Sequence, residues 1–224
     1  MTTRVAPARR RGLADEVADS IRDAIFSGAY ELGAQLREVE LAAALEVSRG
    51  PVREALLRLE REGLVRSAWH RGATVMTLSP EDIAELDSLR GALERLAVEL
   101  VVAQASDTEG TADASGLDAI EQAAARMSRA EDAHAMVRAD IEFHDAVYAA
   151  AGHRRLFEAW QAIRSQVHLF LLTRVGVSTE DYLSHIPGEH RDLVAALRSR
   201  DTETALRLFA AHRRHAFELV TTKR

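Results

Sequence analysis

Apolar residues recur at helical spacing along most of this chain. Val17, Ile21 and Ile25 lie four residues apart, which predicts an amphipathic helix that ends at Gly28. Similar spacing predicts two more helices before residue 64, and two short strands joined by a turn come after them. We expect helices at 13–27, 38–45 and 49–63, strands at 64–66 and 73–75, and a turn-rich connection at 30–36.

Helix-forming residues dominate from Pro80 to the end of the chain. Ser79 and Pro80, followed by two acidic residues, are typical of a helix start, and we place the domain boundary there. The expected helices are 80–105, 115–130, 132–151, 153–175, 180–185, 187–199 and 201–221. A run of helices without strands predicts an antiparallel all-helical bundle.

Two arginines open the helix expected at 49–63. Ser48 precedes this helix and can cap it through its hydroxyl, while Pro51 lies in the first turn, where a missing N–H costs little. The residues expected to face inward are Val52, Leu56, Leu57 and Leu59. This leaves Arg49 and Arg53 together on the outward N-terminal face, the part of a recognition helix that enters a major groove. An arginine there can form a bidentate pair with guanine or bind a phosphate, and each base contact of that kind contributes about 1–3 kcal/mol of discrimination.

Arginines on one helix face are more often merely solvated than bound to DNA. Here they occur together with a short preceding helix, a capped turn and a basic hairpin that contains Arg71 and Gly72. This combination favours a DNA-reading winged helix-turn-helix over a solvated surface.

Composition limits the other possibilities. The chain has 224 residues, enough for two domains, and no cysteine, which excludes disulfides and thiolate metal sites. No apolar run approaches the roughly 20 residues that span a bilayer, and the N-terminus lacks the apolar region of a signal peptide, so we expect a cytoplasmic protein without membrane contact. The net charge is −6, with the acidic excess after residue 78, so only the first part should meet DNA.

Polar residues interrupt the apolar faces of several helices in the second part. Asp140 and His144 lie one turn apart on the inward face of the helix expected at 132–151. His212 lies on the core side of the last helix, and His190 lies at the start of the helix before it. A buried carboxylate needs a cation or a strong donor. One carboxylate and three imidazoles suit a divalent transition metal such as zinc, with coordination positions left open.

Each of these side chains also has a structural alternative. The carboxylate and the first histidine could form a hydrogen-bonded pair, and the other two histidines could be satisfied core residues. Arg90, on the apolar face of the first bundle helix, could form an ion pair with Glu94 one turn on. It could equally bind the carboxylate of a small effector, because a guanidinium binds carboxylates through two parallel hydrogen bonds.

The stretch SRGPVREALLRLEREGLV, followed by HRGATV, resembles the winged helix-turn-helix signature of the GntR family of bacterial transcription regulators. The resemblance implies that Arg49 and Arg53 contact DNA and that the wing approaches the minor groove. The full set of implied DNA-binding residues is Arg37, Ser48, Arg49, Gly50, Pro51, Arg53, Arg71 and Gly72. Gly50 stands where the family commonly has threonine, so a hydroxyl contact to DNA is absent there.

The remainder, 80–224, resembles the FCD ligand-binding domain that follows GntR-type domains in the FadR subfamily. The resemblance rests on Asp140-x-x-x-His144, on Glu189-His190, and on Asp201 with Ala205 and His212. It implies that the aspartate and the three histidines bind a metal, often zinc or nickel, at the floor of an effector pocket. For this chain we expect zinc, with nickel and manganese as the alternatives. Arg90 matches an arginine that such domains commonly carry beside this pocket.

The fold class expected is therefore mainly α, with a winged helix-turn-helix domain followed by an FCD-type bundle. We assign residues 1–12 to a flexible basic arm, 13–78 to DNA binding, and 79–224 to effector binding and dimerisation. The expected protein is a homodimeric, metabolite-responsive repressor that binds double-stranded operator DNA and a small organic acid, and it is not an enzyme. The alternatives are a metal-dependent, hydrolase-like enzyme that uses the Asp and His cluster, and a regulator in which the metal is purely structural.

Overall fold

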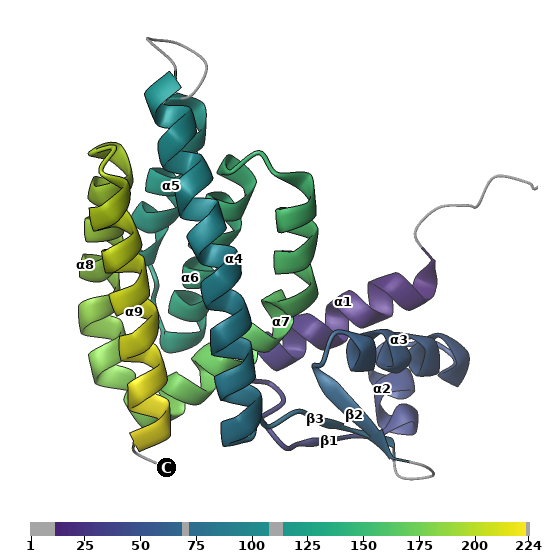
Figure 1. The fold of residues 1–224 in the computed structure, drawn as a ribbon. Helices are drawn as coiled ribbons and strands as arrows, with labels where there is room; N and C mark the ends of the chain where they lie inside the picture. The colour runs from purple at the N-terminus through teal and green to yellow at the C-terminus, as the bar shows by residue number, and fades with distance from the viewer. Residues whose placement is uncertain (1–11, 69–71, 108–113, 223–224) are drawn as a thin grey trace, which may run out of the picture. The chain divides into compact units, whose positions relative to one another are not determined.

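The computed structural model describes residues 12–68, 72–107 and 114–222 (Figure 1). The chain divides into two compact units, Met1–Met76 and Thr77–Arg224. Among the described residues, no helix is both long enough and apolar enough to cross a membrane.

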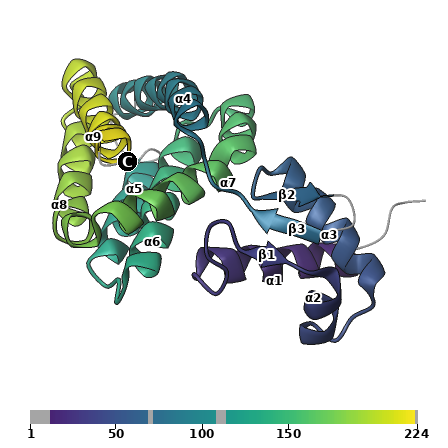
Figure 2. The same ribbon diagram turned by 90° about the horizontal axis from the view of Figure 1, so that it is seen from below.

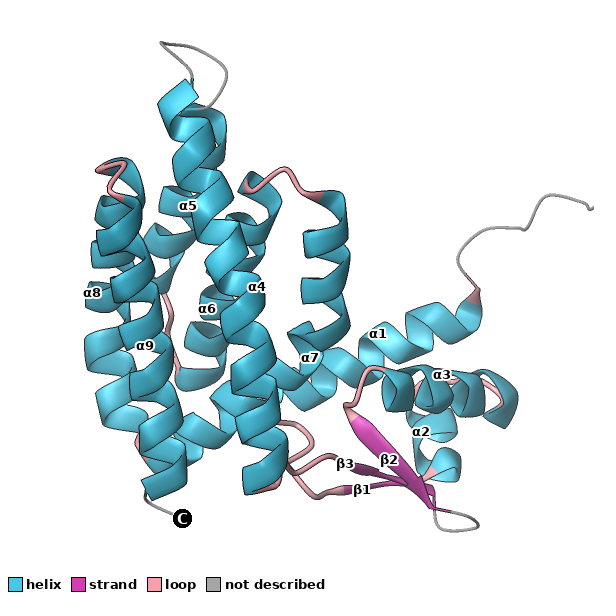
Figure 3. Ribbon diagram, viewed as in Figure 1, coloured by secondary structure: helices cyan, strands magenta, loops and turns pink. Residues whose placement is uncertain are grey.

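The described part of the first unit combines three helices with a small antiparallel sheet (Figure 3). Its elements are α1 (Leu13–Phe26), β1 (Gln35–Leu36), α2 (Glu38–Ala44), α3 (Arg49–Arg61), β2 (Val65–Ala68) and β3 (Gly72–Val75). The strand order is β1-β3-β2, so the hairpin partner β3 lies in the middle. Buried Ile21, Ile25, Val52 and Leu59 join α1 to α3 in the core. The three expected helices and the hairpin are confirmed.

The strand β1 was not expected, because 30–36 was predicted to be an irregular connection. Two residues are too few to show an alternating pattern, and Gln35 and Leu36 become a strand only by pairing with Thr74 and Ala73. The backbones approach closely at this point. A Cβ added at Gly72, where φ is +78°, would lie 2.5 Å from the Leu36 carbonyl oxygen.

The start of α3 differs from the prediction in two details. Ser48 is the N-cap residue, but its side chain makes no capping hydrogen bond. Pro51 occupies the third helical position and has no N–H, which removes one of the two donors that an N-cap hydroxyl usually accepts from. Leu57 was expected to face inward, but 48% of its surface is exposed, because the buried stripe runs through Val52 and Leu56 instead.

The described part of the second unit contains helices joined by short loops, and no strand. Its helices are α4 (Pro80–Asp107), α5 (Ala114–Met127), α6 (Ala133–Ala150), α7 (Arg154–Val177), α8 (Thr179–Arg198) and α9 (Thr202–Thr222). A reciprocal cap starts α4: the Ser79 backbone N–H donates to Asp82 Oδ2 (2.8 Å), and the Asp82 N–H donates to Ser79 Oγ (3.1 Å). In Figure 2, α9 lies between α4 and α8, and α6 packs against α5 and α7. This is the expected bundle.

One predicted helix boundary is wrong. Pro187 was expected to separate two helices, but α8 runs through it without interruption. Tyr182, Ile186 and His190, spaced four residues apart, are fully buried along one face of α8. Because this face packs on both sides of the proline, the continuous core offsets the one backbone hydrogen bond that proline removes.

Candidate metal centre and nucleic-acid interface

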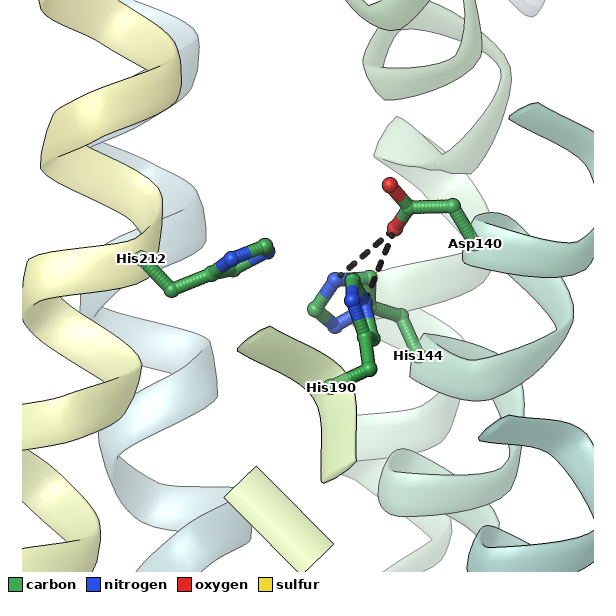
Figure 4. Close-up of side chains that lie close together, drawn as sticks. All are labelled: Asp140, His144, His190 and His212. Carbon is green, nitrogen blue, oxygen red and sulfur yellow. Dashed lines mark ion pairs between the residues drawn. The ribbon is translucent and has the colours of Figure 1, made fainter. Parts of the chain in front are cut away.

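Four side chains from three helices converge in the core of the second unit (Figure 4). Asp140 and His144 come from α6, His190 from α8, and His212 from α9. All four are buried, and one ligand atom from each lies within 4.8 Å of the others. The structure thus brings together the four residues that the sequence singled out.

Two atoms at the centre of this cluster have no hydrogen-bond partner. Asp140 Oδ1 lies 3.4 Å from His144 Nε2 and 3.4 Å from His190 Nε2, yet it accepts no hydrogen bond. His190 Nε2 is also without one. Buried polar atoms are rarely left unsatisfied. A cation at the centre would satisfy both atoms, so the residues fit a bound metal ion.

The polar atoms of these side chains that face away from the centre of the cluster form hydrogen bonds with other protein atoms. Tyr182 donates its hydroxyl to Asp140 Oδ2 (2.7 Å). His190 Nδ1 lies 2.9 Å from the Ile186 carbonyl oxygen, and His212 Nδ1 lies 2.6 Å from Glu189 Oε2. Because these oxygens can only accept, each Nδ1 donates a proton, which leaves Nε2 as the nitrogen that can coordinate a metal. Such outer contacts orient the histidine ligands of metal sites.

Electrostatics favours the protonation states that a metal needs. Burial lowers the pKa of His144 to about 3 and that of His212 to about 4, so both imidazoles are neutral at neutral pH. Burial raises the pKa of Asp140, but the electrostatic attraction of the His190 and His144 imidazoles, each 3.4 Å from Oδ1, holds it well below its usual value. A charged carboxylate with neutral imidazoles is the donor set that binds a divalent metal.

Arg90 lies beside the cluster rather than in solvent. Its Nη2 is 2.7 Å from His144 Nε2 and 3.6 Å from Glu94 Oε2, and the whole residue is buried. The expected contact with Glu94 is therefore present. Burial raises the pKa of Glu94, although Arg90 and Arg213 oppose this. The positive charge of the Arg90 guanidinium therefore lies next to the ligand atoms of the Asp and His cluster.

Sequence reasoning missed two of the supporting side chains, Tyr182 and Glu189. Tyr182 precedes His190 by two helical turns, so it shares the same face, but the predicted break at Pro187 concealed this relation. Glu189 was noted only as part of a motif. Its carboxylate bridges His212 and His215 across two helices, which no local pattern indicates.

The described DNA-binding candidates lie on the surface of the first unit. Arg49 and Arg53 project from the N-terminal turns of α3, and both side chains are mostly exposed. Ser48 and Gly50 are exposed beside them, and Pro51 is partly exposed. This is the open helix start that the sequence predicted.

The remaining candidates lie on either side of this helix start. Arg37 is exposed before α2 and forms an ion pair with Glu40 (2.8 Å). Gly72 begins β3. Arg71, which the sequence analysis assigned to the hairpin, falls outside the residues that the structure describes.

Comparison with known proteins agrees with the division of the chain into two compact units. Residues 13–75 match the family model of bacterial regulatory proteins of the gntR family, and residues 79–215 match that of the FCD domain. A protein of Paenarthrobacter nicotinovorans named "Probable D-xylose utilization operon transcriptional repressor" is 32% identical over 208 residues, which cover 91% of this chain and 86% of the relative. The gluconate operon transcriptional repressor of Bacillus subtilis (strain 168) is 31% identical over 189 residues, 83% of this chain and 75% of the relative.

A solved structure leads to the same assignment. A crystal structure described as that of "a putative transcriptional regulator GntR from Rhodococcus sp. RHA1" superimposes with a TM-score of 0.81 at 27% identity, covering 94% of this chain and 98% of that chain. These relatives are transcriptional regulators and not enzymes, which removes the hydrolase alternative. The chain belongs to the GntR family of bacterial regulatory proteins, carries an FCD domain, and is a metabolite-responsive DNA-binding transcriptional regulator.

Proposed function

We propose that this regulator is a cytoplasmic homodimeric repressor of the FadR subfamily whose operator affinity changes when a small carboxylic acid binds at a metal centre in its FCD domain. The observation that carries the proposal is the buried cluster of Asp140, His144, His190 and His212, with two of its central atoms unsatisfied. A regulator that only bound DNA would have no use for such a costly buried group.

The four clustered side chains would hold the metal, and zinc suits one carboxylate with three imidazoles best, ahead of nickel and manganese. A bound divalent metal supplies a Lewis-acidic position at which carboxylate oxygens can coordinate. Glu189, Tyr182 and the Ile186 carbonyl would keep the ligands oriented whether or not an effector is present.

Arg90 would bind the effector. Its guanidinium faces the ligand atoms and is buried, so a carboxylate placed there would gain a charge-assisted, water-excluded contact. The relative from Bacillus subtilis represses a gluconate operon, and gluconate is itself a small carboxylate. We therefore assign the effector class to small carboxylic acids, sugar acids among them.

DNA would be read by Arg49 and Arg53, with Arg37 at phosphate, Ser48, Gly50 and Pro51 at the backbone, and Arg71 and Gly72 in the wing at the minor groove. One winged helix contacts only a few base pairs, so specificity calls for two half-sites and a dimer. Leu89 and Leu96, seven residues apart on one face of α4, are 49% and 39% exposed. Large apolar side chains in such an arrangement support α4 as a dimer contact.

Elemental analysis of the purified protein, followed by titration of a panel of small carboxylic acids into native and chelator-treated samples, tests the proposal. We expect about one divalent metal per chain and acid binding that disappears after chelation. Acid binding that alters operator affinity would establish the sensor. A metal that is present while no acid binds would instead make it structural, and a metal-free protein would reduce the cluster to a polar core.

A further inference from the structure

A single carboxylate holds both of the arginines at the start of α3. Glu38, the first residue of α2, accepts a hydrogen bond at Oε2 from Arg49 Nη2 (3.0 Å) and from Arg53 Nη2 (2.9 Å). Its Oε1 accepts a third from Arg53 Nε (3.2 Å). Glu38 precedes the arginines by 11 and 15 residues, so this contact depends on the packing of α2 against α3.

The three side chains are arranged so that the carboxylate is sheltered and the arginines are accessible. The side chain of Glu38 is 20% exposed, while those of Arg49 and Arg53 are 59% and 60% exposed. Hydrogen bonds from Arg53 and Arg49 lower the pKa of Glu38, so its negative charge persists at neutral pH. The carboxylate thus lies behind the arginines as a fixed anionic support.

The hydrogen bonds leave donors free for another ligand. Arg53 uses Nε and one hydrogen of Nη2, which leaves Nη1 and the second Nη2 hydrogen on the outer edge of the guanidinium. Arg49 uses only Nη2. Two adjacent N–H groups are what the O6 and N7 acceptors of guanine require. Both arginines can therefore bind a base edge without releasing Glu38.

We propose that Glu38 is a positioning residue that determines DNA sequence specificity, by holding Arg49 and Arg53 in the orientation that reads bases and by neutralising part of their charge. This inference rests on the proposed contact of both arginines with DNA. A free arginine has many rotamers and grips any nearby phosphate, whereas a restrained one discriminates among bases. The carboxylate also repels the DNA backbone, which weakens binding to unrelated sequences.

Glu38→Gln tests the inference, because it keeps the size of the side chain and removes its charge. The probes are a duplex selected by the wild-type protein from a random pool and a scrambled duplex of equal composition. We expect the affinity ratio between the two to fall roughly tenfold, mainly because the scrambled duplex binds more tightly. The logarithmic salt dependence of scrambled-duplex binding should steepen by about 0.9, the effect of one additional uncompensated positive charge.

Two further variants separate charge from position. Glu54→Gln makes the same charge change at an exposed site on α3, where no described hydrogen bond joins residue 54 to either arginine. It should keep the wild-type affinity ratio. Glu38→Asp keeps the charge but withdraws the carboxylate by one methylene, so the affinity ratio should fall while the salt dependence stays close to wild type.

The results distinguish this inference from the function on which it rests. If the wild-type protein selects no sequence from the pool, the proposed DNA reading fails and the role of Glu38 fails with it. If the wild-type protein selects a sequence and Glu38→Gln retains its affinity ratio, only the positioning role is overturned. Circular dichroism of each variant verifies folding, and Glu38→Asp still decides the outcome should Glu38→Gln unfold.

Discussion

At the scale of single residues, burial or exposure of a side chain determines which chemistry it suits. His144 is fully buried, its Nε2 lies 3.4 Å from Asp140 Oδ1, and it stays neutral because burial lowers its pKa to about 3. Arg49 is the opposite case, an exposed cation whose only described partner is Glu38. The first suits a metal ligand, and the second suits a surface that meets DNA.

Replacing Arg49 with alanine should weaken specific operator binding while the fold remains intact. Loss of one bidentate base contact costs about 1–3 kcal/mol, which corresponds to roughly 5- to 150-fold in affinity for the cognate site. Fluorescence anisotropy with cognate and scrambled duplexes measures this loss. Metal content and oligomeric state should match wild type. Loss of helical structure in this variant would show that the side chain supports the fold instead.

Replacing His144 with alanine should lower the metal content without affecting DNA binding in the absence of effector. The variant removes one of four donors, and metal affinity depends strongly on the number of ligands. Elemental analysis after dialysis gives the metal content, and anisotropy gives the DNA affinity. His185→Ala is the matched control, because this exposed histidine on α8 lies outside the cluster. Full metal occupancy in the His144 variant would remove this residue from the site.

At the scale of elements, close backbone approaches and continuous helices set the geometry. The wing strand β3 is paired on both edges, and it can reach β1 only because Gly72 has no side chain. In the second unit, the continuity of α8 through Pro187 places Tyr182 and His190 on one face. Gly72 and Pro187 thus lie within a strand and a helix, although glycine and proline disfavour these structures in most sequences.

Gly72→Ala should destabilise the first unit by about 2 kcal/mol or more, because φ is +78° and the new Cβ would meet the Leu36 carbonyl oxygen. Hydrogen exchange of the first unit and thermal unfolding by circular dichroism both report this change. Gly176→Ala provides the control, since it lies within α7 with nothing within 4 Å of the added Cβ. That variant should be as stable as wild type or slightly more stable. Equal stability of the two variants would contradict the close approach.

At the scale of the whole molecule, two units with different tasks divide the charge. Basic side chains on the first unit face outward at α3, while the second unit carries the acidic excess and buries His144, His168 and His212, whose pKa values burial lowers. The buried histidines make stability depend on pH. His168 is one of them, and burial lowers its pKa to about 3.

The free energy of unfolding should fall as the pH drops from 7.5 to 5. The pKa of His168 is about 3 in the folded protein and about 6.5 when unfolded, so only the unfolded chain takes up a proton in this interval. The contribution of His168 is complete above pH 6.5, declines below it, and amounts to roughly 2 kcal/mol lost at pH 5. Urea unfolding at both pH values measures this difference. His168→Leu should reduce it, and an unchanged pH dependence in that variant would contradict the assignment.

Local patterns in the sequence were sufficient for part of this structure. Helical periodicity predicted the two-part, mainly helical organisation, and the four-residue spacing placed Asp140 beside His144 and Arg49 beside Arg53. These features depend on the geometry of a single helix, which is the same wherever the helix occurs.

Only the tertiary structure decided which elements meet. It brought His190 and His212 to Asp140, supplied Tyr182 and Glu189 as supports, formed β1, and placed Glu38 behind the arginines of α3. None of these contacts has a periodic signal, because each joins residues distant in sequence through the packing of separate elements. The sequence by itself determined the helices and their chemical groups, and packing determined which groups act together.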